Sequence, residues 1–193
     1  MSAPSMNPSL ADRLWPATEG QAVLRAAALA VFGSLLLWAS AKVQVPFYPV
    51  PMTLQTAVVL LIGVAYGPRL AAGTLLLYLA EGAVGLPVFA GTPERGIGLA
   101  YMVGPTGGYL AGFLAAAVIS GWTAERSRHW LTTALGLLAA IVAIHLLGAA
   151  WLATLVGPAK AVSLGVLPFL LGDAVKLALV TAAAEAGLAR PRA

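Results

Sequence analysis

The segment PFLLGDAVKLALV (Pro168–Val180) is apolar except for the carboxylate of Asp173 and the ammonium of Lys176. Residues three apart on a helix share one face, so both charges are expected to point the same way. Charges inside a membrane-spanning helix are costly and usually face a cavity or an ion path. The segment therefore predicts a polar site within an apolar helix. A mutually neutralised pair that only fixes helix packing is the alternative.

The composition of the whole chain places this segment in a membrane protein. Of its 193 residues 60% are hydrophobic and 9% are charged, and the mean hydropathy is +0.90. Soluble domains carry about 25% charged residues. The absence of cysteine excludes disulfides and thiol chemistry. We expect no secretory signal in the polar start of the chain. The arginines are scattered and not clustered, so no nucleic-acid partner is expected.

Six segments reach or approach the length of about 20 apolar residues that a spanning helix needs. They are residues 21–42, 52–66, 70–84, 106–124, 130–156 and 161–188. Gly67-Pro68 separates the second from the third, and Gly157-Pro158 ends the fifth. The predicted fold is an all-α integral membrane protein, a bundle of six transmembrane helices. One transmembrane domain, 1–193, is expected, with a polar N-terminal segment (1–20), the bundle (21–188) and a basic tail (189–193).

The basic residues predict the orientation of this bundle, because cytoplasmic loops carry an excess of Lys and Arg. With six spans, one side holds Arg13, Arg25, Arg69, Arg126, Arg128, Arg190 and Arg192 together with both termini. The other side holds Lys42, Arg95 and Lys160. We therefore expect both termini in the cytoplasm of a multi-pass protein of the inner (cytoplasmic) cell membrane. If one helix is miscounted, the loops that follow it would lie on the opposite side of the membrane.

Two loops on the non-cytoplasmic side are unusually apolar. VQVPFYPVPMT (Val43–Thr53) contains three prolines, and the long segment Gly85–Gly108 is rich in glycine and proline. A solvated loop would be polar, so these loops are expected to fold back over the bundle as a lid above a ligand pocket. An interfacial re-entrant segment without a ligand is the alternative.

Small residues recur at every fourth position of two predicted helices. The two sets are Ala22, Ala26, Ala30 and Ser34, and Gly104, Gly108, Gly112 and Ala116. Such faces let membrane helices approach closely. Packing inside the bundle is sufficient to explain the second set. For the first set, docking to another membrane protein is an equally good explanation.

Glu81 and Arg95 add two more ionisable groups near the same membrane face. With Asp173 and Lys176 they favour a polar ligand site over a single structural ion pair. An enzyme is not expected, because no motif for nucleophilic, metal or nucleotide chemistry is present. His145 stands alone on an apolar helix and is interpreted as a hydrogen-bonded core residue.

Three stretches match a known family. They are PVPMTLQT (Pro49–Thr56), GLPVFAG with VGPTGGYLAGF (Gly85–Gly91 and Val103–Phe113), and PFLLGDAVK (Pro168–Lys176). In their order and spacing they resemble the BioY family, the biotin-binding membrane subunits, or S components, of energy-coupling factor (ECF) transporters. The resemblance extends from about residue 26 to residue 184.

The resemblance implies a fold and a set of partners. It implies six helices, cytoplasmic termini and a biotin pocket on the extracytoplasmic side that loops close. It also implies docking to a transmembrane coupling subunit through the small face of the first helix, here Ala22, Ala26 and Ala30. Two cytoplasmic ATPase subunits would complete the complex. They would use the ATP, so no cofactor is expected in this chain.

The resemblance also implies site residues. Asp173 and Lys176 match the family's polar pair in the last helix, and Arg95 falls near its loop arginine. Glu81 stands where we expect a neutral amide as often as an acid. The candidate apolar walls are aromatic, namely Tyr78, Phe89, Tyr101, Tyr109 and Trp151.

The chemistry of biotin assigns a role to each polar candidate. Its ureido ring has two N–H donors and one carbonyl acceptor, so Asp173 accepts from one N–H and an ionised Glu81 from the other. Lys176 donates to the ureido oxygen or to the carboxylate of the ligand. Arg95 suits that carboxylate better, because its planar guanidinium pairs in bidentate fashion. Gln55 adds a hydrogen bond.

Two other classes of protein remain as alternatives. A secondary transporter would carry biotin or a similar small solute without an ATPase partner, although no clear inverted repeat is visible. A small integral-membrane enzyme or assembly protein is the other, and the missing catalytic motifs argue against the enzyme. Binding of biotin to the purified chain alone discriminates between these classes.

Overall fold

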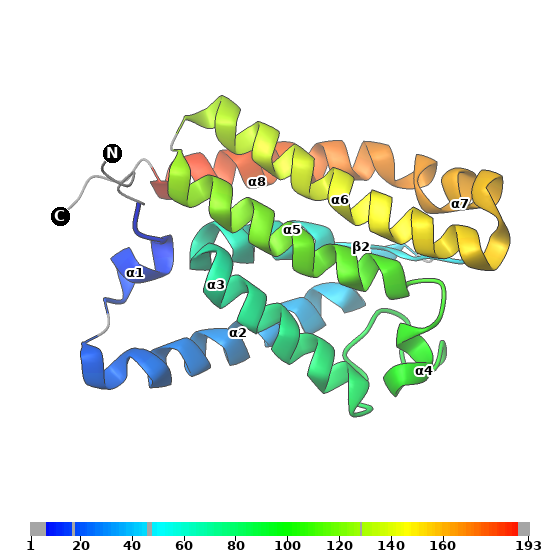
Figure 1. Ribbon diagram of the computed structural model, residues 1–193, viewed down its shortest axis with the longest axis horizontal. Coiled ribbons are helices and arrows are strands. Elements are labelled where there is room, and N and C mark those ends of the chain that lie inside the picture. Colours follow the sequence, from blue (N-terminus) through cyan, green and yellow to red (C-terminus); the bar gives the residue numbers. More distant parts are fainter. Residues whose placement is uncertain (1–6, 17, 46–47, 128, 189–193) are drawn as a thin grey trace.

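The computed structural model describes residues 7–16, 18–45, 48–127 and 129–188. These residues form a helical protein with one short two-stranded sheet (Figure 1). The larger helices are α2 (Ala22–Lys42), α3 (Gln55–Ala83), α5 (Gly107–Arg126), α6 (Trp130–Val156) and α8 (Leu170–Leu188). The shorter elements are α1 (Leu10–Leu14), η1 (Glu19–Gln21), β1 (Gln44–Val45), β2 (Met52–Thr53), α4 (Gly98–Met102), α7 (Pro158–Gly165) and η2 (Leu167–Phe169).

Five helical segments of the described chain are long and apolar enough to cross a membrane. They are α2, α3, α5, α6 and the combined stretch Pro158–Gly187. The fold is therefore that of an all-α membrane protein with five candidate spans. The sequence predicts six, and the difference lies in α3, which contains the second and third predicted segments.

α3 is a helical hairpin that reverses at Gly67. This residue has φ 75° and ψ 169°, a conformation that glycine adopts readily, and Pro68 follows it. Gln55 Nε2 lies 2.6 Å from the Tyr78 hydroxyl, whereas 23 residues of straight helix would separate them by about 35 Å. The break that the sequence predicts at Gly67-Pro68 is thus confirmed. The first arm, 55–66, is shorter than the about 20 residues of a full span.

The prediction that 161–188 forms one continuous helix is wrong. α7 ends at Gly165, η2 follows, and α8 begins only at Leu170. Pro168 explains the interruption, because proline has no N–H for the helical ladder and disfavours helix at the preceding residue. Asp173 therefore lies in the first turn of α8 and not in mid-helix. The partial positive charge of a helix N-terminus makes a carboxylate less costly there.

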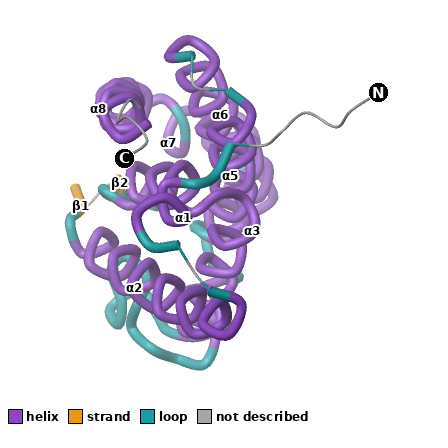
Figure 2. The backbone as a smooth tube through the Cα atoms, turned by 90° about the vertical axis from the view of Figure 1, so that its left-hand side faces the viewer, coloured by secondary structure: helices purple, strands orange, loops and turns teal. Residues whose placement is uncertain are grey.

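The helices are arranged in three layers. Figures 1 and 2 show α6 and α8 on one side, α5 with α3 in the middle, and α2 on the other side. Small residues allow the middle contacts to be close: a Cβ at Gly112 of α5 would lie 2.7 Å from Ile144 Cα of α6. Gly108, Gly112 and Ala116 are buried, so the small-residue face of this helix serves packing inside the bundle.

α2 is largely exposed and packs mainly against α3. Its second half is buried at Gly33, Ser34 and Leu37. In its first half Ala22 is exposed, and Ala26 and Ala30 are half-buried. The small-residue stripe of α2 is thus only partly covered by the chain itself.

Both ends of the described chain lie at the same end of the bundle. The Asn7 backbone N–H donates to Glu125 O at the end of α5, at 2.9 Å. A Cβ at Gly187, near the end of α8, would lie 3.1 Å from Leu10 Cδ1 of α1. Residues 1–6 and 189–193, which include the predicted basic tail, lie outside the described residues.

At the opposite end two connections fold onto the bundle. The first pairs β1 with β2 in antiparallel fashion, Val45 opposite Met52. The second is the segment 84–106 between α3 and α5, hereafter the α3–α5 connection, which contains α4. Figure 1 shows it wrapped around the end of α3.

Candidate functional site

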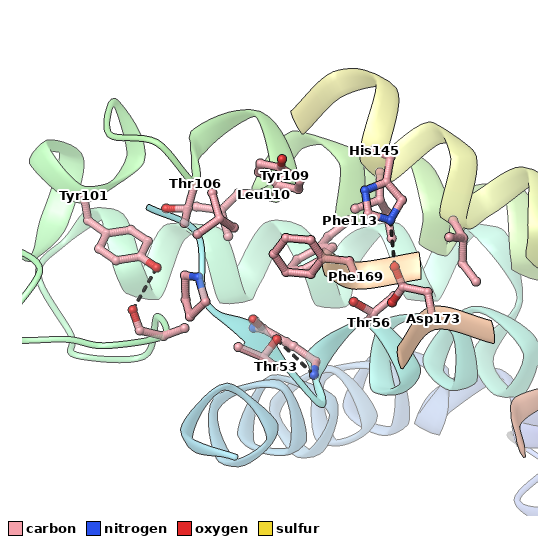
Figure 3. A pocket seen from close by; sticks show the side chains of 16 residues that line it. Thr53, Thr56, Tyr101, Thr106, Tyr109, Leu110, Phe113, His145, Phe169 and Asp173 are labelled. Carbon is pink, nitrogen blue, oxygen red and sulfur yellow. Dashed lines mark hydrogen bonds and ion pairs between the residues drawn. The ribbon is translucent and has the colours of Figure 1, made fainter. Parts of the chain in front are cut away.

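A cavity lies inside the bundle between the two connections and helices α3, α5, α6 and α8 (Figure 3). Its wall is formed by Val50, Pro51, Thr53, Gln55, Thr56, Ala90, Tyr101, Thr106, Tyr109, Leu110, Phe113, Ile141, Ile144, His145, Phe169 and Asp173. Four of these are predicted site residues: Gln55, Tyr101, Tyr109 and Asp173. Eight of the sixteen wall residues are apolar and eight carry a polar group. The polar groups come from several elements and converge on one cavity, as in a small-molecule site.

Asp173 is the buried charge of this cavity, with 5% of its surface exposed. Its Oδ1 lies 3.0 Å from Lys176 Nζ one turn further along α8. Its Oδ2 lies 2.7 Å from His145 Nε2 of α6. The prediction that Asp173 and Lys176 share a face is confirmed. Lys176 itself stands behind Asp173 and is not part of the cavity wall.

Gln55, at the start of α3, is 3% exposed and is held by Tyr78 of the second arm. Its Nε2 donates to the Tyr78 hydroxyl at 2.6 Å, and that hydroxyl donates to Val88 O at 2.9 Å. Tyr78 is fully buried behind Gln55 and does not line the cavity. Since Nε2 is engaged, the carbonyl Oε1 is the atom of Gln55 that remains for a ligand.

Aromatic rings form the apolar part of the wall. The Tyr109 hydroxyl donates to Gly165 O at 2.7 Å, which satisfies a carbonyl that the interrupted α7 leaves without a helical partner. Phe169 of η2 lies 6.5 Å from the Tyr109 ring and 6.0 Å from the His145 ring, between ring centroids. The break at Pro168 thus contributes Phe169 to the wall.

The α3–α5 connection contributes Ala90, Tyr101 and Thr106 to the wall. The Tyr101 hydroxyl donates to Ala90 O at 2.9 Å. Burial raises the pKa of Tyr101, so this hydroxyl keeps its proton. Phe89 packs behind, stacked on Tyr101 with ring centroids 4.9 Å apart. The connection is therefore an ordered part of the site.

Three side chains hold these connections in place. Lys42 at the end of α2 reaches the carbonyl oxygens of Pro87, Phe89 and Thr92 at 2.8, 3.1 and 3.4 Å. Arg95 Nη1 donates to Pro49 O at 3.1 Å and so links the α3–α5 connection to the segment after β1. Trp151 Nε1 of α6 donates to Gly104 O at 2.8 Å.

Six predicted site residues are not part of the cavity wall: Lys176, Arg95, Glu81, Tyr78, Phe89 and Trp151. Glu81 is the most distinct of them. Its Oε1 accepts from the Ser34 hydroxyl of α2 at 3.0 Å, at the α2–α3 interface. The other five contact wall residues or hold the connections that carry them.

Sequence reasoning missed His145, Phe113 and Phe169 as wall residues. His145 is hydrogen-bonded, as predicted, but its partner is the central carboxylate of the cavity. The available signal was one polar ring in an otherwise apolar helix. Phe113 and Phe169 gave no signal, because apolar residues fill every segment of this chain.

The chemistry of this arrangement is that of binding. One carboxylate receives two side-chain donors, an amide presents its carbonyl, and aromatic rings surround them. Within the described residues no cluster of His, Cys, Asp and Glu could hold a metal ion. The fold and the cavity define a multi-pass membrane protein with an internal cavity that presents both polar and apolar groups.

Comparison with known proteins gives the family. Residues 10–192 match the BioY family, and the chain belongs to that family. It is 44% identical over 145 residues to a "Probable biotin transporter BioY" of Pyrococcus horikoshii, covering 75% of this chain and 85% of that protein. It is 35% identical over 148 residues to the "Biotin transporter BioY" of Thermotoga maritima, covering 76% and 85%.

The fold is also similar to a solved structure, the crystal structure of the S-component for biotin from an ECF-type ABC transporter. The TM-score is 0.78 and the identity 23%, over 91% of this chain and 96% of that chain. The resemblance that the motifs predict is thus confirmed. Membership in a family of transporters also agrees with the expectation that the chain is not an enzyme.

Proposed function

We propose that this protein captures biotin for uptake, as the S component of an ECF transporter. The observation that carries the proposal is the buried carboxylate of Asp173 in an apolar cavity of a BioY-family chain. Relatives with 44% and 35% identity are named as biotin transporters, which supports the same ligand.

The groups of biotin match those of the cavity. Asp173 accepts hydrogen bonds from the ureido N–H groups, and Lys176, which lies behind it, holds Oδ1 of that carboxylate and balances its charge. Gln55 Oε1 offers a further acceptor. The rings of Tyr109, Phe113 and Phe169 enclose the apolar bicycle. Analogues that lack a ureido N–H would leave a buried acceptor without a partner, so the site discriminates against them.

Arg95 is proposed to receive the biotin carboxylate. Its guanidinium lies on the α3–α5 connection, in contact with Pro49 O, where the two connections meet. We propose that these connections act as a lid above the cavity and that Arg95 pairs with the ligand when the lid closes over it. Glu81, bonded to Ser34 away from the cavity, has no part in this proposal.

For topology we propose six crossings, with the two arms of α3 counted separately and both termini in the cytoplasm. The proximity of α1 to the ends of α5 and α8 supports an even number of crossings. The excess of arginines on the side of the termini supports the orientation.

The proposed partners are a transmembrane coupling subunit and two cytoplasmic ATPase subunits. The small residues Ala22, Ala26 and Ala30 of α2 are proposed to contact the coupling subunit. Their incomplete burial within the chain supports this surface.

Equilibrium binding of radiolabelled biotin to the purified chain in detergent tests the function. Saturable binding that unlabelled biotin displaces is expected, and its absence would contradict the proposal. Uptake with and without co-expressed energising subunits then separates an S component from a secondary transporter. Uptake without those subunits would favour the secondary transporter.

A further inference from the structure

The imidazole of His145 joins α6 to the central carboxylate of the cavity. Its Nε2 lies 2.7 Å from Asp173 Oδ2, and its side chain is 12% exposed. Lys176 holds the other oxygen, Oδ1, but stands on the same helix as Asp173 and moves with it. His145 is therefore the contact that fixes the carboxylate relative to the opposite wall of the site (Figure 3).

Charge balance assigns the donor in this contact. Asp173 and Lys176 neutralise each other, and a third, uncompensated charge in apolar surroundings is costly. A neutral imidazole has one N–H, and a carboxylate only accepts, so the proton is on Nε2. Nδ1 is buried and has no hydrogen-bond partner in the described part of the chain. The Nε2–H to Oδ2 bond is thus the polar interaction of this ring.

The bond leaves the carboxylate able to receive a ligand. An ionised carboxylate has about four acceptor sites, and His145 and Lys176 occupy one on each oxygen. One site therefore remains on each oxygen, at fixed positions. A ureido ring that presents N–H donors needs acceptors of this kind, held before the ligand arrives.

Other contacts hold the ring itself. The Tyr109 ring meets it edge-on at 6.5 Å and 89°, and the Tyr109 hydroxyl is anchored on Gly165 O. His145, Ile141 and Asp173 also border a second, apolar groove between α6 and the α7–α8 stretch. The imidazole therefore also separates the cavity from this groove.

We infer that His145 is a positioning residue of the biotin site, which orients Asp173 through the Nε2–H to Oδ2 bond so that the carboxylate accepts from the ureido ring. The inference rests on the proposed function and extends it to a residue on α6. In this role the hydrogen bond of His145 matters for ligand binding, whereas for a wall residue that only fills space the bulk of the side chain would be sufficient.

Two variants with side chains of roughly similar size separate the hydrogen bond from the bulk of the ring. His145→Gln keeps an N–H donor at about the reach of Nε2, whereas His145→Leu keeps apolar bulk and loses the donor. The measurement is equilibrium binding of biotin and of a biotin analogue methylated on one ureido nitrogen. We expect His145→Leu to weaken biotin binding about 10- to 100-fold, the range for a hydrogen bond to a charged group. We expect His145→Gln to stay within about threefold of wild type, because it keeps that bond.

The analogue provides the readout that a purely structural role would not change. It has one ureido donor fewer, so it depends less on the orientation of Asp173. The preference of wild type for biotin over the analogue should therefore shrink in His145→Leu and persist in His145→Gln. Unchanged affinity and preference in His145→Leu, or equal losses in both variants, would overturn the inference.

If wild type does not bind biotin, the proposed function fails and the inference fails with it; if wild type binds and His145→Leu is unchanged, only the inference fails. If His145→Leu does not fold, His145→Gln and His145→Asn decide. The shorter Asn does not reach Oδ2, so a loss in Asn alone supports the inference, and equal binding by both overturns it.

Discussion

Asp173 is the residue on which the proposed site depends most. It lies in the first turn of α8, buried, with a donor on each oxygen. Asp173→Asn removes the charge and replaces one acceptor by a donor, and Lys176→Ala leaves a buried carboxylate without its counter-ion. We expect each change to weaken biotin binding by about 2–5 kcal/mol, from the cost of breaking buried charge pairs.

The control for this prediction is Asp12→Asn. Asp12 also forms an ion pair, 2.9 Å from Arg25, but it lies on α1 at the other end of the bundle. The Asp12→Asn variant should bind biotin with the affinity of wild type. Thermal unfolding of all three variants shows whether they fold. Normal binding by Asp173→Asn and Lys176→Ala would make the pair structural.

Arg95 tests the carboxylate end of the ligand. If it pairs with the valerate, Arg95→Ala should weaken biotin at least about tenfold and biotin methyl ester much less. Arg95→Lys should restore binding only in part, because an ammonium cannot bind in bidentate fashion. The contact of Arg95 with Pro49 O supplies the competing explanation, a link between the two connections. Equal losses of affinity for biotin and for its methyl ester in binding assays would favour that link. Lys176 would then be the remaining candidate partner of the biotin carboxylate.

At the residue scale, the sequence predicts charged groups well and apolar walls poorly. Asp173 and Lys176 stand out because charge is rare in this chain. Glu81 stands out equally, yet its partner is Ser34 on α2, a contact that depends on how α2 meets α3. Phe113 and Phe169 are wall residues only because of tertiary packing, which no periodicity reveals.

At the scale of elements, glycine and proline predict one helix break and miss another. Gly67-Pro68 predicts the reversal in α3, since glycine allows φ 75° there. Pro168 has the same capacity to end a helix, but the apolar run on both sides hides the break before α8. That break sets the position of Asp173 and Phe169, so the missed boundary was also a missed part of the site.

Lys42 forms the contact between the end of α2 and the α3–α5 connection. Lys42 binds three carbonyl oxygens of that connection, while Tyr101 and Tyr78 hold it from inside. Lys42→Ala should release biotin about three- to tenfold faster, because the proposed lid opens more often once charge-assisted bonds are lost. The association rate should change less.

The measurement is dissociation of labelled biotin after addition of excess unlabelled ligand. Lys160→Ala is the matched control, since Lys160 is an exposed lysine of α7 away from the connection. Unchanged release by Lys42→Ala would mean that the tyrosines alone keep the connection closed.

At the scale of the whole molecule, composition alone predicts a helical membrane protein, and the structure has that fold. The number of spans is harder to predict, because the first arm of α3 is shorter than a full span. The ligand is harder still. Apolar composition does not encode it, and only the motifs resembling the BioY family indicate biotin.

The first half of α2 carries the surface proposed to contact the coupling subunit. Ala26 and Ala30 are half-buried, on the same stripe as the buried Ser34 that packs against α3. Ala26→Trp should leave biotin binding unchanged and reduce both uptake and recovery of the coupling subunit in a pull-down, by about tenfold, since bulk prevents close helix approach. Ala28→Trp is the control, because Ala28 is exposed on the opposite face of α2. If Ala26→Trp instead loses biotin binding, the stripe belongs to the α2–α3 interface, and α2 docks to its partner through another face.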